Sequence, residues 1–527
     1  MFNPTITLRP DNRTLDRLRD NGGSHHHPPR HNMPTEKSDT ANKDTPPSPK
    51  PIPIDKIIVT KHKARINGET FAYTVTCGTV VLKEDTEKDG NREAEKPRAS
   101  IFFMAYTKDG VKDASKRPLT FSFNGGPGSS SVWLHLGVLG PKRVKLDNEG
   151  NAGPPPYQLV DNDFSLLNET DLVFIDPVGT GYSRMVDGES VKEFHNYQRD
   201  LESVGEFIRL YTSRHLRWAS PKFIAGESYG TTRAAGLSSH LQEKYGLYVN
   251  GLLLLSTALD FSTFRFMVGH DLSHALFLPT YAATAWYHKK LDKSLQAKPL
   301  RAFLDEVEAF VEAEYHAALF KGDKLAPARR TAIAKKISQY TGLSVAYIEQ
   351  TNLRISIHRF CKELCRDEHR TVGRLDSRFK GIDRDAAGEN IEYDPAHSNL
   401  DGAYAACLND YVRRELKFES DTPYKVISQL YLTWNFGADN QHLNVAETLR
   451  KAMNMNPHMK VYVGSGYFDL ATPHFATDYV LNHMALDKSL VANLDVHYYE
   501  AGHMMYIHMP SLKAQAKHLR DFVKRAK

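Results

Sequence analysis

Four short apolar runs restrict the possible fold more than any other feature of the chain. Between residues 119 and 257 they read "LTFSFNGGPG", "DLVFIDPVGTGYS", "KFIAGESYGT" and "VNGLLLLST", and all but the last run into a Gly-rich turn. Helical segments separate them, which is typical of a mostly parallel sheet with both faces covered. Ligand sites in such sheets lie at the carboxyl ends of the strands, so we expect the functional residues in these turns.

The rest of the chain extends this pattern. "IIVTKHKARI", "TFAYTVTCGTVVL" and "ASIFFMAYT" predict meandering strands that open the sheet, and "MKVYVGSGYFDLATP" and "LDVHYYEAGHMMY" predict strands that close it. Long helical patterns separate the two groups. We therefore predict an α/β fold whose core has two parts, residues 54–261 and 425–527, interrupted by a helical cap insertion at residues 262–424. A closing amphipathic helix has four apolar residues near one face: Leu512, Leu519, Phe522 and Val523.

The first 53 residues differ in composition. They are rich in Pro, Gly, His and charged residues, so residues 1–53 are predicted to be a disordered arm. The run His25–His27 fits a solvated tail better than a metal site. No apolar leader of the length that secretion requires is visible, which favours a cytoplasmic location. If the true start of the chain or its leader differs, the protein would instead be secreted or periplasmic.

Charge and apolar content exclude two classes of partner. The net charge is +5 over 527 residues and the basic residues are scattered, so nothing indicates nucleic acid. No run of about 18 apolar residues occurs, so no membrane span is expected. Four cysteines are too few for a disulfide framework in a chain of this length.

Two histidine-containing groups could suggest metal sites. One group would lie on a single stripe of a predicted helix: His358, Cys361, Cys365 and His369. That stripe rises about 16 Å at about 1.5 Å per residue, too far for one zinc ion to bind all four side chains. His270 and His274 are four residues apart and have no evident third ligand. We expect both groups to be packing or surface residues, and we predict neither a metal nor a cofactor.

The segment Gly226–Gly230 fits the pattern G-x-S-x-G at a point where a strand ends and a helix begins. Glycines permit the sharp turn, because larger side chains would clash there. The turn places the Ser228 hydroxyl at a helix N-terminus, where developing negative charge is favoured. Ser228 is therefore a candidate nucleophile, although the pattern alone also fits a structural turn with an incidental serine.

A nucleophilic serine needs a base and a residue that orients the base. In sheet enzymes of this class the order along the chain is Ser, then Asp or Glu, then His. Asp469 and His503 follow later strands, so the order Ser228, Asp469, His503 fits. The class also predicts an oxyanion hole formed by the N–H groups of Tyr229 and Gly126, the latter in the turn "NGGPG".

Together these segments resemble the serine carboxypeptidase family, a branch of the α/β-hydrolase fold. "NGGPGSSS", "FIDPVGTGYS", "GESYG", "GSGYFDLATP" and "AGHMM" match its signature blocks in order and spacing, from about Ala99 to the C-terminus apart from the divergent middle. The resemblance implies Ser228, Asp469 and His503 as catalytic triad. It also implies a serine-type carboxypeptidase that acts on peptides through an acyl-enzyme, with the helical insertion as the cap that shapes its pocket.

The resemblance gives Glu227 a function as well. The family binds the free C-terminal carboxylate of a peptide through an Asn, a Gly and two carboxyl groups that share a proton, and Asn124, Gly125 and Glu227 occupy three of these places. The second glutamate falls on Val138, so Glu227 loses one cause of a raised pKa. We predict weaker carboxylate recognition or a higher pH optimum than the family's. Ser129 replaces a disulfide cysteine of many relatives, as in bacterial members.

Two other functions share these features. An acyltransferase or esterase would form the same acyl-enzyme with another acceptor or donor, and the loss of a carboxylate-reading group would suit it. A non-catalytic binding protein on a hydrolase fold is disfavoured because all three triad residue types are present. The sequence determines neither the preferred side chain of the substrate nor the oligomeric state.

Overall fold

The computed structural model describes residues 53–88 and 91–527, which belong to one compact unit. The predicted arm at residues 1–53, with its run His25–His27, lies outside the described residues except for its last residue. No described helix is both long enough and apolar enough to cross a membrane.

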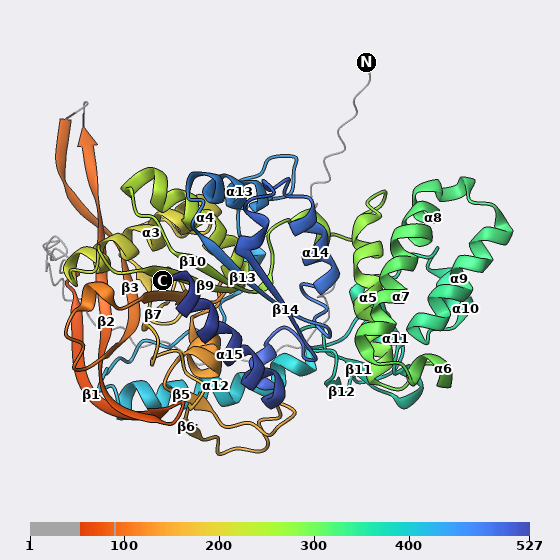
Figure 1. Ribbon diagram of the computed structural model, residues 1–527, viewed down its shortest axis with the longest axis horizontal. Coiled ribbons are helices and arrows are strands. Elements are labelled where there is room, and N and C mark those ends of the chain that lie inside the picture. Colours follow the sequence, from red (N-terminus) through yellow and green to blue (C-terminus); the bar gives the residue numbers. More distant parts are fainter. Residues whose placement is uncertain (1–52, 89–90) are drawn as a thin grey trace, which may run out of the picture. The chain divides into compact units, whose positions relative to one another are not determined.

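A ten-stranded sheet crosses the described part of the chain (Figure 1). Its strands are β1 (Lys56–Ile66), β2 (Glu69–Lys88), β3 (Asn91–Lys108), β4 (Leu119–Phe123), β7 (Asp171–Ile175), β8 (Arg184–Met185), β9 (Lys222–Ser228), β10 (Gly251–Thr257), β13 (Lys460–Gly466) and β14 (Leu494–Tyr499). The order is β1-β2-β3-β7-β4-β9-β10-β13-β14, with β8 paired to β3. The pairs from β1 to β7 are antiparallel and those from β7 to β14 are parallel, which confirms the predicted α/β fold with a mostly parallel sheet.

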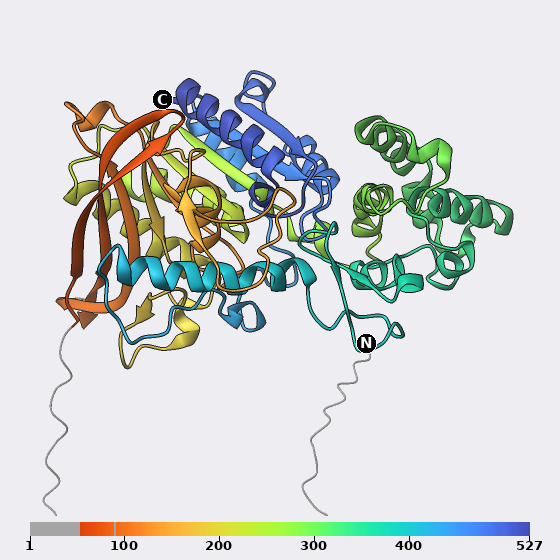
Figure 2. The ribbon, with the colours of Figure 1, turned by 90° about the horizontal axis from the view of Figure 1, so that it is seen from below.

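Successive residues of the central strands enter two different hydrophobic clusters. Leu252 and Leu254 of β10 pack in the cluster that contains residues of α3 (Tyr197–Arg214), α4 (Tyr229–Tyr245) and α13 (Ala446–Met455). Leu253 and Leu255 pack on the opposite face, against α12 (Pro395–Arg414) and α15 (Met509–Ala526) (Figures 1 and 2). This continuous burial on both faces explains the unbroken run of leucines, because neither side of the strand contacts water.

The chain between β10 and β13 is mainly helical. Its helices before α12 are α5 (Leu272–Tyr287), α6 (Lys293–Gln296), α7 (Leu300–Phe310), α8 (His316–Lys321), α9 (Pro327–Thr341), α10 (Val345–Gln350) and α11 (Ile357–Glu363). They enclose a third hydrophobic cluster, which also contains Tyr467, Phe468 and Leu470 from the loop after β13. The insertion therefore packs on the residues that flank Asp469. The boundaries of the cap stay a prediction, and α12 packs with the sheet.

One expectation about the insertion is wrong. Because α11 ends at Glu363, the histidines and cysteines between residues 358 and 369 do not share one helical stripe. Cys361 and Cys365 are buried in the hydrophobic cluster of the insertion, and His369 has a left-handed backbone conformation after a short turn. Within the described ranges, no group of three or more His, Cys, Asp or Glu side chains could hold a metal ion.

Shorter elements connect the sheet and its helices. They are α1 (Val132–Leu134), a π-helical turn at His135–Leu139, α2 (Val191–Phe194), α14 (His474–Asn482), the hairpin of β5 (Lys142–Val144) and β6 (Leu159–Asp161), and the hairpin of β11 (Thr371–Val372) and β12 (Lys380–Gly381). The β11–β12 hairpin matters for the site, because Leu375 in the loop between its strands hydrogen-bonds the backbone of His503, which follows β14.

The predicted closing helix is confirmed as α15, and its apolar face suggests a stability test. Phe522 is buried, and its ring lies 6.3 Å from that of Phe223 and 5.9 Å from that of Tyr462. We expect Phe522→Ala to lower the free energy of unfolding by about 3 kcal/mol, since it leaves a cavity beneath the sheet. Urea unfolding would measure this. Lys517→Ala, on the exposed face of the same helix, should change stability little, and equal losses for both variants would contradict the packing described.

Candidate active site

The turn from β9 into α4 holds Ser228 in an unusual backbone conformation. Ser228 has φ 60° and ψ −130°, which side chains rarely adopt, and α4 begins at the next residue. The turn is tight because glycines stand on both sides: a Cβ atom on Gly226 would lie 2.2 Å from the carbonyl oxygen of Gly230. The predicted strand–turn–helix around the serine is confirmed, and the strain lies at the candidate nucleophile.

The loop after β4 lies directly against this turn. A Cβ atom on Gly125 would lie 2.4 Å from the backbone nitrogen of Tyr229, so only glycine permits the contact. Gly126 has φ 103°, and its N–H donates no hydrogen bond in the described part of the chain. The Tyr229 N–H is the first of α4, where a helix offers no internal acceptor. Two N–H donors thus lie in neighbouring turns.

Asp469 and His503 form the hydrogen bond that a base and its orienting residue require. His503 Nδ1 lies 2.8 Å from Asp469 Oδ2, and Asp469 is fully buried. The other oxygen of Asp469 accepts from the N–H groups of Ala471 (2.8 Å) and Thr472 (3.0 Å). With its carboxylate held this way, Asp469 accepts the Nδ1–H of His503 and leaves Nε2 available for proton transfer.

The backbone of His503 is fixed from two other segments, which the sequence did not reveal. Its N–H donates to the carbonyl oxygen of Leu375 (2.6 Å), in the loop between β11 and β12, and its carbonyl oxygen accepts from Ser256 Oγ (2.6 Å) at the end of β10. Burial alone would lower the pKa of His503, but the Asp469 carboxylate, with help from Glu227, raises it above its ordinary value.

One pocket of about 220 Å³ collects most of the predicted residues. Its lining comprises Asn124, Gly125, Gly126, Ser129, Trp133, Glu227, Ser228, Arg374, Leu375, His397, Ile427, Tyr431, Ala471, His503 and Met504. Asp469 lies behind His503 and Tyr229 contributes only from its backbone, so neither lines it. No hydrogen bond joins Ser228 to His503 here, as is common in unliganded sites. Sequence reasoning missed Trp133, Arg374, Leu375, His397, Ile427, Tyr431, Ala471 and Met504.

Glu227 is a buried carboxyl group with one unused oxygen. Its Oε1 accepts a hydrogen bond from Asn124 Nδ2 (2.9 Å), whereas the buried Oε2 makes no hydrogen bond of good geometry, although the Tyr506 hydroxyl lies near the carboxyl group. Burial raises the pKa of Glu227 to about 7, although the nearby His503, Tyr506 and Asn124 act in the opposite direction. A second carboxyl group is therefore not needed to keep Glu227 protonated in weakly acidic solution.

Tyrosines surround Glu227 on the side where the family pattern would place a glutamate. Val138 itself is fully buried in a hydrophobic cluster. Its neighbour Gly137 lies against Tyr506, because a Cβ atom there would be 2.3 Å from the tyrosine ring and 3.2 Å from the hydroxyl of Tyr404. Glu227 raises the pKa of both tyrosines further, beyond the effect of burial, so both stay neutral beside it.

An ion pair beneath the turn connects three elements. Arg233 of α4 is almost completely buried; its Nε donates to Asp200 Oδ2 of α3 (2.8 Å) and its Nη1 donates to the carbonyl oxygen of Asn124 (2.7 Å). Burial raises the pKa of Asp200 above its ordinary value, and the guanidinium opposes that rise. This pair holds the loop after β4 and the helix after Ser228 in a fixed relation.

The segment 425–445 runs along the pocket as a strap, and two of its residues line it. It pairs through single bridges with the turns that follow β4, β7 and β10: Ser129 with Ile427, Gly181 with Lys425, and Asp260 with Asn444. Two hydrogen bonds strengthen the first bridge, from Ser130 N to Val426 O (2.9 Å) and from Ser428 N to Gly128 O (2.7 Å). Ile427 and Tyr431 of this strap then form one wall of the pocket.

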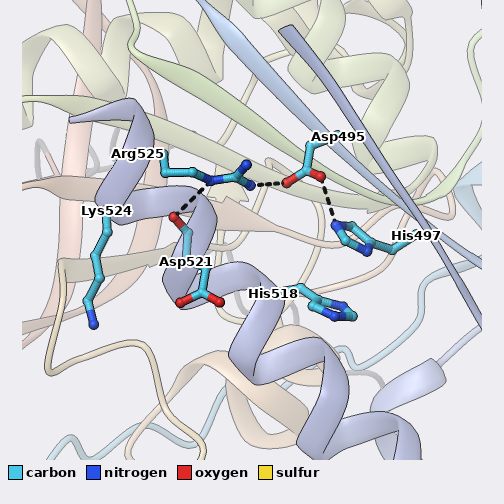
Figure 3. A pocket seen from close by; sticks show the side chains of 6 residues that line it. All are labelled: Asp495, His497, His518, Asp521, Lys524 and Arg525. Atoms are coloured by element: carbon cyan, nitrogen blue, oxygen red, sulfur yellow. Dashed lines mark hydrogen bonds and ion pairs between the residues drawn. The ribbon is translucent and has the colours of Figure 1, made fainter. Parts of the chain in front are cut away.

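A larger hollow of about 500 Å³ between β14 and α15 is a poor candidate for a reaction site (Figure 3). It is lined by Asp495, His497, His518, Asp521, Lys524 and Arg525, none of which is paired with a nucleophilic side chain. Asp495 is held between His497 Nε2 (2.9 Å) and Arg525 Nη2 (2.5 Å), so its charge is already neutralised. The candidate site remains the pocket that contains Ser228.

Comparison with known proteins identifies a family. The family model described as serine carboxypeptidase (Peptidase_S10) matches residues 89–506. "Serine carboxypeptidase-like 36" of Arabidopsis thaliana is 28% identical over 190 residues, which cover 33% of this chain and 36% of that protein. The pheromone-processing carboxypeptidase KEX1 of Saccharomyces cerevisiae (strain JAY291) is 32% identical over 153 residues, covering 28% of this chain and 19% of its own. The alignments thus span about a third or less of these relatives.

A solved structure shows the same fold over a longer range. The crystal structure of Kex1(Δ)p, a prohormone-processing carboxypeptidase from Saccharomyces cerevisiae, superposes with a TM-score of 0.52 and covers 85% of this chain and 91% of its own. Sequence identity in this superposition is 16%, so it supports the fold alone.

The buried ion pair gives a pH-dependent stability test. Arg233→Met leaves the Asp200 carboxyl buried without a cation, which should cost about 3–5 kcal/mol of unfolding free energy at neutral pH. Without Arg233 the pKa of Asp200 rises further, and an acid with a raised folded pKa favours the folded state at low pH. The loss relative to the unmodified protein should therefore be larger at about pH 8 than at about pH 5. Urea unfolding at both values measures it; Arg414→Met, in an exposed pair, should show no such difference.

Proposed function

Because the chain belongs to the serine carboxypeptidase family, we propose that it is a serine-type carboxypeptidase that removes C-terminal residues from peptides through an acyl-enzyme. The observation that carries the proposal is one pocket containing Ser228, His503 hydrogen-bonded to Asp469, and the buried Glu227. Hydrolysis of an amide needs a nucleophile, a base and oxyanion donors, and Ser228, His503 and the N–H groups of Gly126 and Tyr229 would serve as these.

The proposed reaction has two halves. Ser228 Oγ attacks the last peptide carbonyl carbon while His503 Nε2 takes its proton, and the negative oxygen accepts hydrogen bonds from the N–H groups of Gly126 and Tyr229. His503 then returns the proton to the leaving nitrogen, so the C–N bond breaks and an ester to Ser228 remains. Water, deprotonated by His503, cleaves that ester and restores the serine. Asp469 keeps the imidazole in the required tautomer throughout.

The free carboxylate of the substrate would bind at Asn124, Gly125 and Glu227. Glu227 can donate a hydrogen bond to a carboxylate only in its protonated form, and Oε2, the oxygen that Asn124 does not bind, is the one that would carry the proton. Its raised pKa, about 7, supports this use. Weaker carboxylate recognition or a higher pH optimum than the family's, expected from Val138, stays a prediction. Burial raises the pKa of Glu227 without a second carboxyl group, and this would reduce the effect of Val138.

Removal of the nucleophile tests the proposal. Ser228→Ala should lower kcat/KM on a peptide with a free C-terminus by roughly 10⁴-fold or more and abolish labelling by a fluorophosphonate probe. Digestion of a peptide mixture by the unmodified protein should give a ladder shortened from the C-terminus. Labelling without a ladder, together with ester cleavage or acyl transfer to an added acceptor, would favour an esterase or acyltransferase. Absence of both labelling and hydrolysis would favour a binding protein.

The protonation of Glu227 predicts a fall in kcat/KM at rising pH that affects only substrates with a free C-terminal carboxylate. As pH rises through about 7, Glu227 ionises and repels the substrate, so kcat/KM for a free-acid peptide should fall about tenfold per pH unit relative to its C-terminal amide. In Glu227→Gln the amide N–H donates at every pH, and this relative fall should disappear. Parallel pH profiles on both substrates measure it. The same fall in both proteins would show that another group titrates.

A further inference from the structure

Arg374 places an unpaired positive charge in the catalytic pocket. Its half-buried side chain lines the same pocket as Ser228 and His503. Within the described part of the chain, its guanidinium makes no ion pair or side-chain hydrogen bond. The next arginine in the loop differs, since Arg378 forms a buried pair with Asp376 (2.7 Å). A guanidinium held in a pocket without a carboxylate partner has donors available for a ligand.

The backbone of this loop is fixed beside the proposed triad. The carbonyl oxygen of Arg374 accepts from the N–H of Leu470 (3.0 Å), adjacent to Asp469, and that of Leu375 accepts from the N–H of His503 (2.6 Å). The Arg374 side chain therefore starts from a rigid position between the two loops that carry the base and its orienting residue. Its charge acts on His503 directly, since it opposes the rise in the pKa of that imidazole.

Two carboxylates that flank the Arg374 loop are already used by other groups. Asp469 accepts from His503, Thr472 and a backbone N–H. Asp394, at the start of α12, accepts from the N–H groups of Leu375 (2.9 Å) and Ala396 (3.0 Å). These carboxylates are bound by backbone donors and by His503, and neither lies within 4.0 Å of the guanidinium. The pocket wall formed by Arg374 therefore favours an anion.

His397 connects this wall to the end of the pocket that would hold the substrate carboxylate. It lies in the first turn of α12, two residues after the helix begins, and its ring packs on that of Trp133 (5.8 Å between centroids). Trp133 precedes Leu134, whose N–H donates to Asn124 Oδ1 (3.0 Å). The buried Nε2 of His397 has no hydrogen-bond partner. Arg374 and His397 thus line the same pocket as Asn124 and Glu227.

We propose that Arg374, with His397 in the same pocket, selects peptides whose C-terminal residue has an acidic side chain. Since this role presupposes the peptidase function proposed above, the α-carboxylate binds at Asn124 and Glu227 while the side-chain carboxylate binds the guanidinium. Arginine suits this because its planar donors match a carboxylate in two parallel hydrogen bonds. A neutral amide of the same shape lacks the second acceptor oxygen and the charge.

Four peptides test this proposal. They share the same N-terminally blocked sequence and differ only in the C-terminal residue, which is Glu, Gln, Leu or Lys. At about pH 5.5 a glutamate side chain, with an ordinary pKa of about 4.3, is ionised. We expect the unmodified protein to prefer Glu over Gln by about tenfold in kcat/KM, the scale of one hydrogen bond to a charged group. In Arg374→Gln the Glu-to-Gln ratio should fall to about one, and Arg374→Lys should keep part of it.

The control removes a charge outside the pocket. Among the described residues, Arg370 donates only to the neighbouring carbonyl oxygen of His369 (2.9 Å), so Arg370→Gln should keep the Glu-to-Gln ratio. Labelling by the fluorophosphonate probe shows that the variants fold and keep the nucleophile. A ratio near one in the unmodified protein, or an equal loss on all four peptides in Arg374→Gln, would overturn the selectivity role. Cleavage of none of the four despite labelling would overturn the peptidase function itself.

Discussion

The strained turn at Ser228 is the constraint on which the rest of the site depends. A non-glycine residue at φ 60° and ψ −130° costs on the order of 1–3 kcal/mol, and it persists only where the surroundings determine it fully. Here glycine backbones approach so closely that no side chain fits between them, and the buried Arg233–Asp200 pair holds the helix and the facing loop in place. The two candidate oxyanion donors come from the two sides of that contact. Nucleophile and donors are therefore positioned by one packing arrangement.

The sequence was sufficient where a candidate catalytic residue stands at the end of a strand. Ser228 ends β9, and Asp469 and His503 follow β13 and β14; a parallel sheet brings such ends to one edge, so their proximity could be argued without coordinates. The parallel order and the closing helix followed from apolar runs and helical periodicity. Loops without periodicity gave no such signal. Arg374 and His397 reach the pocket only because the loop between β11 and β12 and the start of α12 fold back on the triad, and no local pattern encodes that tertiary contact.

The substitution at Val138 shows how one chemical property can come from two physical sources. Two carboxyl groups in contact raise a pKa by repulsion, whereas a single buried carboxyl group has its pKa raised by lost hydration. In this pocket Glu227 has no carboxyl partner at Val138 and is buried beside Asn124 and Tyr506, yet its pKa rises to about 7. The missing carboxyl group at Val138 alone therefore underestimates the pKa of Glu227, because the burial of a side chain cannot be read from one position of a sequence.

The strap at residues 425–445 has a mechanical consequence. Its hydrogen bonds attach to Gly128 and Ser130, just after the loop that supplies Gly126, so one wall of the pocket and one side of the candidate oxyanion site belong to one hydrogen-bonded structure. A peptide that displaces Ile427 or Tyr431 on entering would pull on the same backbone that must hold a donor in position. Substrates that fit poorly against this wall would then react slowly as well as bind weakly, and discrimination among them would appear in kcat as much as in KM.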